Sequence, residues 1–81
     1  MAKYTLKIKN GTSNEPVIFA YIYKDEKYIC CKLLAPIKDY INEPAKYKTI
    51  AEKWFDEAIK ILRDAEEFNA YILKEVEIWN I

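Results

Sequence analysis

The sequence contains no histidine and no glutamine, and Gly11 is its only glycine among 81 residues. Without imidazole, Ser-His-Asp and Cys-His arrangements and histidine-based metal sites are excluded. A single glycine also cannot form a glycine-rich phosphate loop. The two cysteines, Cys30 and Cys31, are adjacent, so on a strand they face opposite sides and form neither a mutual disulfide nor a four-ligand zinc site. We therefore expect no enzyme activity, no cofactor and no metal.

The formal net charge is zero, because 13 Lys and Arg residues balance 13 Asp and Glu residues. A dedicated duplex-binding protein gains most of its affinity by neutralising phosphates, so this balance argues against one. No run of about 18 or more apolar residues is present, and the first residues lack the apolar core of a signal peptide. We therefore expect no membrane contact and a cytoplasmic location, in the host cell if the source is viral.

The residue types that are abundant are Lys, Glu, Ile and Tyr. Depletion of thermolabile residues with Lys and Glu enrichment is a hyperthermophile tendency, and an AT-rich genome gives a similar bias. The composition therefore indicates a hyperthermophile or an AT-rich genome, and we expect a virus or mobile element as the source.

The chain is short enough for one domain, residues 1–81, and its apolar pattern changes from alternating to helical. Polar and apolar residues alternate at the start, and two further β-favouring runs follow after short polar segments. Three strands with such short connections indicate an antiparallel meander. We expect the strands at residues 3–9, 17–23 and 28–34.

A long helical pattern follows at residues 44–68, where apolar residues recur every three or four positions. Its start has two candidates: Pro44 in the first helical position, or the capping-box pattern that begins at Thr49. Residues 37–43, between two prolines, fit a single helical turn or an irregular connector.

The tail, residues 71–79, allows two interpretations. Val76 and Ile78 alternate with glutamates in a β-favouring composition, which predicts a fourth strand. The alternative is a continued helix with Phe68, Ile72, Val76 and Trp79 on one side. The predicted fold is α+β: an antiparallel β-sheet in the order β-β-β-α-β, with one long amphipathic helix packed on one face.

The helix can cover only one face of this sheet, and the first strand shows which residues belong there. Its apolar face consists of Tyr4, Leu6 and Ile8. The second strand is apolar or aromatic throughout, so its inner set is either Ile18, Ala20 and Ile22 or Val17, Phe19, Tyr21 and Tyr23. In the third strand we expect Ile29, Cys31 and Leu33 to face the helix, with Cys31 as a buried small side chain, and Tyr28, Cys30 and Lys32 to face outward.

With the smaller aliphatic set under the helix, the outer face combines aromatic side chains with lysines. This candidate binding surface consists of Phe19, Tyr21, Tyr23, Tyr28, Lys3, Lys7, Lys9 and Lys32. Tyrosines can occupy a sheet surface without any function. An aromatic centre with a charged rim is typical of protein interfaces. Aromatic rings between lysines can also form a stacking platform for single-stranded nucleic acid.

Of these three interpretations we favour the protein interface. We expect a small non-catalytic binding module that acts by protein contact, for example by inhibiting a host factor. Self-association as a homodimer, through the outer face or an edge strand, would cover the excess apolar surface. Single-stranded nucleic-acid binding is the alternative; it is disfavoured by zero net charge and by a predicted sheet without arginine.

The exterior of the predicted helix is a second candidate surface. It carries carboxylates at Asp56, Glu57, Asp64 and Glu67, which could bind a basic partner. Lysines lie between them, which weakens the negative potential. A solvated helix surface is the simpler interpretation of these four residues.

Overall fold

The computed structural model describes residues 3–11, 16–62 and 71–78. These residues form the following elements, in chain order: β1 (Lys3–Asn10), β2 (Val17–Lys24), β3 (Lys27–Pro36), α1 (Ile37–Asn42), α2 (Pro44–Leu62) and β4 (Tyr71–Glu77). The bounds of the first three strands differ from the expected ones by at most two residues. The tail is a strand and not a continued helix. The predicted end of the long helix near residue 68 lies outside the described residues.

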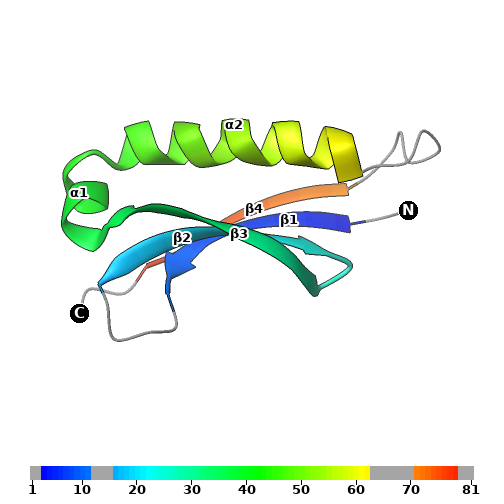
Figure 1. The fold of residues 1–81 in the computed structure, drawn as a ribbon, viewed down its shortest axis with the longest axis horizontal. Helices are drawn as coiled ribbons and strands as arrows, with labels where there is room; N and C mark the ends of the chain where they lie inside the picture. The colour runs from blue at the N-terminus through cyan, green and yellow to red at the C-terminus, as the bar shows by residue number, and fades with distance from the viewer. Residues whose placement is uncertain (1–2, 12–15, 63–70, 79–81) are drawn as a thin grey trace.

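The four strands form one sheet in the order β3-β2-β1-β4, and α2 lies along one face of it (Figure 1). The predicted α+β class, with one long helix packed on one side of the sheet, is confirmed. Strands β1, β2 and β3 are antiparallel neighbours, as the meander pattern predicts. The sheet differs from the prediction in one respect: β4 pairs parallel with β1, so the sheet is mixed.

The parallel pairing of β4 follows from the length of α2. A 19-residue helix advances about 28 Å, which nearly equals the span of an eight- to ten-residue strand. The helix therefore returns the chain from the end of β3 to the end of the sheet where β3 began (Figure 1). A strand that starts there must run in the direction of β3, which is also the direction of β1.

The core lies between α2 and the inner sides of the two central strands. In β1 the side chains of Tyr4, Leu6 and Ile8 are buried, as expected. In β2 the buried side chains are Ile18, Ala20 and Ile22. From α2 they are covered by Ala51, Phe55 and Ile59, whose spacing of four residues places them on one side of the helix. The smaller aliphatic set of β2 therefore faces the helix, and its aromatic set faces outward.

The side-chain order in β3 differs from the prediction because the strand contains two bulges. Pairing with β2 skips one residue between Tyr28 and Cys30 and another between Leu33 and Ala35. Each extra residue shifts the alternation by one position. Cys31 and Leu33 are therefore in register with outward-facing residues of β2 and are exposed, while Cys30 packs against the core. The expectation that Cys31 is buried is wrong.

The same shift also changes the face on which Lys32 lies. It is in register with Ala20, whose side chain is buried on the helix side of the sheet. Lys32 is itself exposed, at the edge of the sheet. It therefore belongs to the helix side and not to the outer face where we expected it.

The connection from β3 to α2 fits the first of the two predicted helix starts. Pro44 is the first residue of α2. The Thr49 hydroxyl donates to the carbonyl oxygen of Ala45 at 2.9 Å, a bond from within the helix and not from its cap. The preceding helix α1 buries Ile37 and Tyr40, and the ring of Tyr40 stacks on that of Tyr47 with centroids 6.1 Å apart. This short segment closes one end of the core.

Candidate functional site

The outer side of the sheet, which α2 leaves uncovered, carries four aromatic side chains in contact with one another. Phe19, Tyr21 and Tyr23 are alternate residues of β2, and Tyr28 is in register with Tyr23 on β3. Neighbouring ring centroids lie 5.9 to 6.5 Å apart in tilted or edge-to-face orientations, which are favourable geometries for aromatic pairs. We call this group of four residues the aromatic surface.

The side chains of β3 extend the aromatic surface to the edge of the sheet. Tyr28 and Leu33 are both 57% exposed, and Leu33 is in register with Phe19. The exposed Cys31 lies between them, and its side chain is hydrogen-bonded to that of Tyr28. This bond, with burial as a smaller cause, raises the pKa of the Tyr28 phenol to about 12. Burial also raises the pKa of Tyr21, against the opposing effect of Lys9. Both phenols therefore stay neutral at physiological pH.

Two lysines of β1 lie over these rings. Lys9 Nζ is 4.9 Å from the ring centroid of Tyr21 and donates a hydrogen bond to the Tyr23 hydroxyl at 3.2 Å. Lys7 Nζ is 5.1 Å from the ring centroid of Tyr23. Cation–π contacts of this kind contribute about 0.5–1 kcal/mol each at exposed sites. The lysines therefore help to fix the tyrosine rings in place.

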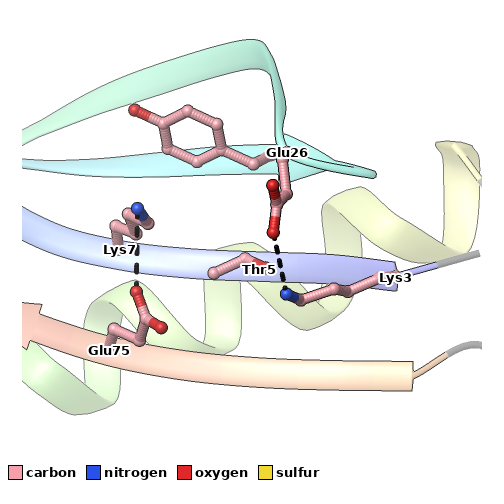
Figure 2. A pocket seen from close by; sticks show the side chains of 6 residues that line it. Lys3, Thr5, Lys7, Glu26 and Glu75 are labelled. Carbon is pink, nitrogen blue, oxygen red and sulfur yellow. Dashed lines mark hydrogen bonds and ion pairs between the residues drawn. The ribbon is translucent and has the colours of Figure 1, made fainter.

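The charges of β1 are largely matched by carboxylates. Figure 2 shows the ion pairs of Lys3 with Glu26, at 3.3 Å, and of Lys7 with Glu75 on β4, at 3.7 Å. Between the two pairs, beside the nearly buried Thr5, lies a shallow hollow of about 330 Å³. Its wall on the β2 side is formed by Tyr23, so the hollow borders the aromatic surface. The outer face is thus divided into an apolar half on β2 and β3 and a charge-paired half on β1 and β4.

The structure brings together seven of the eight residues predicted for the outer face: Phe19, Tyr21, Tyr23, Tyr28, Lys3, Lys7 and Lys9. Lys32 is excluded, as described above. The prediction missed Leu33, Cys31, Glu26 and Glu75. Leu33 and Cys31 were missed because the bulges of β3 leave no mark in an apolar run. Glu75 could have been found only from the parallel register of β4.

The predicted acidic surface on α2 is of mixed charge. Asp56 and Glu57 are exposed there, but Lys53 and Lys60 line the same shallow hollow on the helix exterior. Asp64 and Glu67 lie outside the described residues. The described part of this face therefore offers no continuous negative potential.

The described residues contain neither a metal-binding cluster nor a membrane-spanning helix. Within residues 3–11, 16–62 and 71–78, no three carboxylate or thiol side chains gather closely enough to hold a metal ion. In that same part of the chain, no helix is both long and apolar enough to cross a membrane.

The chain matches no protein-family model, and comparisons with curated proteins and with solved structures found no significant match. The outer face of the sheet is thus the strongest candidate site.

Proposed function

We propose that this chain is a small non-catalytic binding module that acts by contact with another protein, through the aromatic surface. The observation that carries the proposal is the position of this surface. Phe19, Tyr21, Tyr23 and Tyr28 form one cluster on the face that α2 does not cover. Phe19, Tyr21 and Tyr23 are half-buried and Tyr28 is exposed. A contiguous apolar patch on the surface of a monomer often marks an interaction site.

The composition of the surface supports a protein partner. Tyrosine is enriched at the energetic centres of protein interfaces because its ring is large, rigid and amphipathic. The ion pairs of Lys3 and Lys7 lie on one side of the cluster, as a polar rim does at an interface. The partner we expect presents an apolar strip of its own, since the apolar half of the face is bordered by charges already paired within the chain.

Single-stranded nucleic acid is the alternative ligand, and one observation disfavours it. Two of the three lysines on the outer face are paired with Glu26 and Glu75, which leaves less positive charge for a phosphate backbone. The inhibition of a host factor, the viral source and the cytoplasmic location remain predictions from the sequence.

The experiment that tests the protein-binding proposal compares two double variants with the wild-type chain. Tyr21→Ser with Tyr28→Ser removes the centre of the aromatic surface, and Lys53→Ser with Asp56→Ser changes the exterior of α2. Each chain is immobilised, and proteins captured from cell lysate are quantified and then titrated after purification. We expect the affinity for the captured protein to fall about tenfold or more in the first variant and to stay unchanged in the second.

The nucleic-acid alternative has its own readout. Fluorescence anisotropy with a labelled single-stranded oligonucleotide should show no binding at physiological salt. Salt-dependent binding that Lys7→Glu abolishes would replace the proposed function by this alternative. The proposed protein binding would also be contradicted if the wild-type chain and the variant with Tyr21→Ser and Tyr28→Ser captured the same proteins equally well.

A further inference from the structure

We infer that this chain pairs with a second copy of itself through the free edge of β3, and that the pairing joins two aromatic surfaces into one. The inference deepens the proposed function and rests on it, because self-association is the event that it locates. Three observations support it: the exposed apolar residues of β3, the flank of α2 above them, and the register in which two β3 strands can meet.

The edge of β3 exposes large apolar side chains beside the exposed Lys27 and Lys32. This strand has ten residues and is the outermost in the order β3-β2-β1-β4. Among its exposed residues are Tyr28, Ile29 and Leu33, at 57%, 39% and 57%. An exposed edge of this kind is a template for pairing with another chain. The other edge, β4, also exposes Ile72 and Val76, but three of its seven residues, Lys74, Glu75 and Glu77, are charged, which protects it.

The flank of α2 on the side of β3 is also apolar and incompletely covered. Glu52 is ion-paired with Lys74 of β4 at 3.2 Å, which fixes the flank of α2 that faces β4. Trp54 follows two residues later, about 200° around the helix axis, and therefore lies on the opposite flank, toward β3. Ile50 occupies the same flank and is 38% exposed. An additional strand beside β3 would lie beneath this flank and cover it further.

The sequence of β3 allows antiparallel pairing with itself in one favourable register. Around a two-fold axis at Cys31, this residue lies opposite Cys31 of the second copy, and Cys30 lies opposite Lys32. Ile29 then lies opposite Leu33, which is an apolar pair. No like charges face each other in this register. Moving the two-fold axis to Lys32 places Lys32 opposite Lys32, and moving it to Cys30 replaces the apolar pair of Ile29 and Leu33 by Ile29 opposite Cys31. The two bulges leave Cys30 to Leu33 regular, so the pairs nearest the axis lie in a regular segment, and Ile29, the extra residue of the first bulge, directly precedes it.

The consequence for function concerns the size of the binding surface. In the paired molecule β2 and β3 of one copy continue into β3 and β2 of the other. The apolar halves of the two outer faces then become the centre of a single eight-stranded sheet, and the charge-paired halves lie at its two ends. The partner of the dimer would therefore contact one aromatic area about twice as large.

The two adjacent cysteines provide a matched test of the register. Cys30→Ser leaves only Cys31, and Cys31→Ser leaves only Cys30. Directly opposite residues of paired strands have Cβ atoms about 5 Å apart, close to the separation that a disulfide spans. Diamide removes two electrons and two protons from a pair of thiols and is itself reduced to the hydrazine. We expect it to produce a covalent dimer from the Cys30→Ser chain and little from the Cys31→Ser chain.

A charge exchange at the same position tests the pairing without oxidation. Cys31→Lys and Cys31→Asp each place like charges opposite each other, so each chain alone should self-associate about tenfold more weakly. A mixture of the two places Lys opposite Asp and should form the mixed dimer, detected by native mass spectrometry. Circular dichroism checks that both variants fold.

The outcomes separate this inference from the proposed function. A wild-type chain that sediments as a monomer at tens of micromolar overturns the pairing, while the capture experiment still decides the role of the aromatic surface. The pairing through β3 is also overturned if Cys31→Lys and Cys31→Asp leave the dimer unchanged while Tyr21→Ser with Tyr28→Ser abolishes it. Self-association would then use the outer face. Loss of partner capture in the aromatic variant, with the dimer intact, supports both proposals.

Discussion

The ring of Phe19 lies against the backbone of Gly11: a Cβ placed on Gly11 would come within 2.8 Å of Phe19 Cε2 and 3.1 Å of Cδ2. The amide of Gly11 donates to the carbonyl oxygen of Val17 at 3.0 Å, which holds this point of the chain beside β2. The only glycine of the chain thus leaves room for one ring of the aromatic surface.

The substitution Gly11→Ala should therefore displace the Phe19 ring. Because the ring is half-buried and can turn only partly aside, we expect a loss of about 1 kcal/mol in the free energy of unfolding, measured by urea denaturation. The matched control is the same substitution in a Phe19→Ala chain, where it should cost little. An equal cost in both chains would show that the contact with Phe19 is not the cause.

The core and the helix face of the sheet could be predicted from the sequence because they follow simple periodicities. Alternation in β1 identified Tyr4, Leu6 and Ile8, and it reduced the inner set of β2 to two possibilities, of which the structure contains the smaller aliphatic one. Both inferences hold because one helix covers one face. The start of α2 at Pro44 is one of the two starts that the sequence predicts, and it is the one that the fixed backbone of proline suits.

The candidate site was less predictable at β3 and β4. Between Tyr28 and Ala35 only Lys32 is charged, so the period of this run carries little information about which residues face out. A bulge in such a segment leaves no recognisable pattern in the sequence. The ion pair of Lys7 with Glu75 joins residues 68 positions apart. It exists only because β4 enters parallel to β1, which depends on the path of α2.

Two buried tyrosines should respond in opposite ways to loss of the hydroxyl. Tyr4 donates to the carbonyl oxygen of Leu62 at 3.5 Å, whereas the Tyr40 hydroxyl is buried and has no hydrogen-bond partner among the residues that the structure describes. Removing a bonded group leaves a polar atom unpaired, while removing an unbonded one relieves a desolvation penalty. We expect Tyr4→Phe to lower the free energy of unfolding by about 1 kcal/mol and Tyr40→Phe to leave it unchanged or raise it.

Thermal and urea denaturation of both variants provide the measurement. The two substitutions remove the same atom from equally buried rings, so each is the control for the other. A comparable loss of stability in Tyr40→Phe would mean that its hydroxyl does have a partner in solution. Burial raises the pKa of Tyr40, so the comparison is made near neutral pH, where both phenols are protonated.

The two cysteines should differ in their reaction with thiol reagents. Cys31 is exposed on the outer face, whereas Cys30 packs against the core, and burial followed by the neighbouring Cys31 raises the pKa of its thiol. Thiolate is the reactive form, so both access and pKa slow Cys30. We expect the Cys30→Ser chain, which retains Cys31, to react with a maleimide severalfold faster than the Cys31→Ser chain.

This comparison is made in dilute protein, so that contact between copies does not shield either thiol. In denaturant the two chains should react at similar rates, which removes intrinsic differences between the positions. A faster reaction at Cys30 would mean that Cys30 and not Cys31 is exposed, as the alternation in the sequence predicts. It would therefore contradict the bulges of β3.

The hydrogen bond between Tyr28 and Cys31 should be visible in the alkaline titration of the protein. It is the largest of the causes, burial being the next, that raise the pKa of the Tyr28 phenol from 10.0 to about 12. Because the folded state holds this proton more tightly than the unfolded state, the contribution of Tyr28 to stability is complete below pH 10 and is lost as the pH rises through about 12. In the substitution Cys31→Ala the pKa of Tyr28 should fall toward 10.0. Cys30→Ala is the matched control, since Cys30 contributes less than Cys31 to the rise in that pKa. The measurement is an NMR titration of ring-labelled tyrosine, in which the signal of Tyr28 is assigned by its loss in Tyr28→Phe. An equal change in the pKa of Tyr28 in the two cysteine variants would contradict the hydrogen bond.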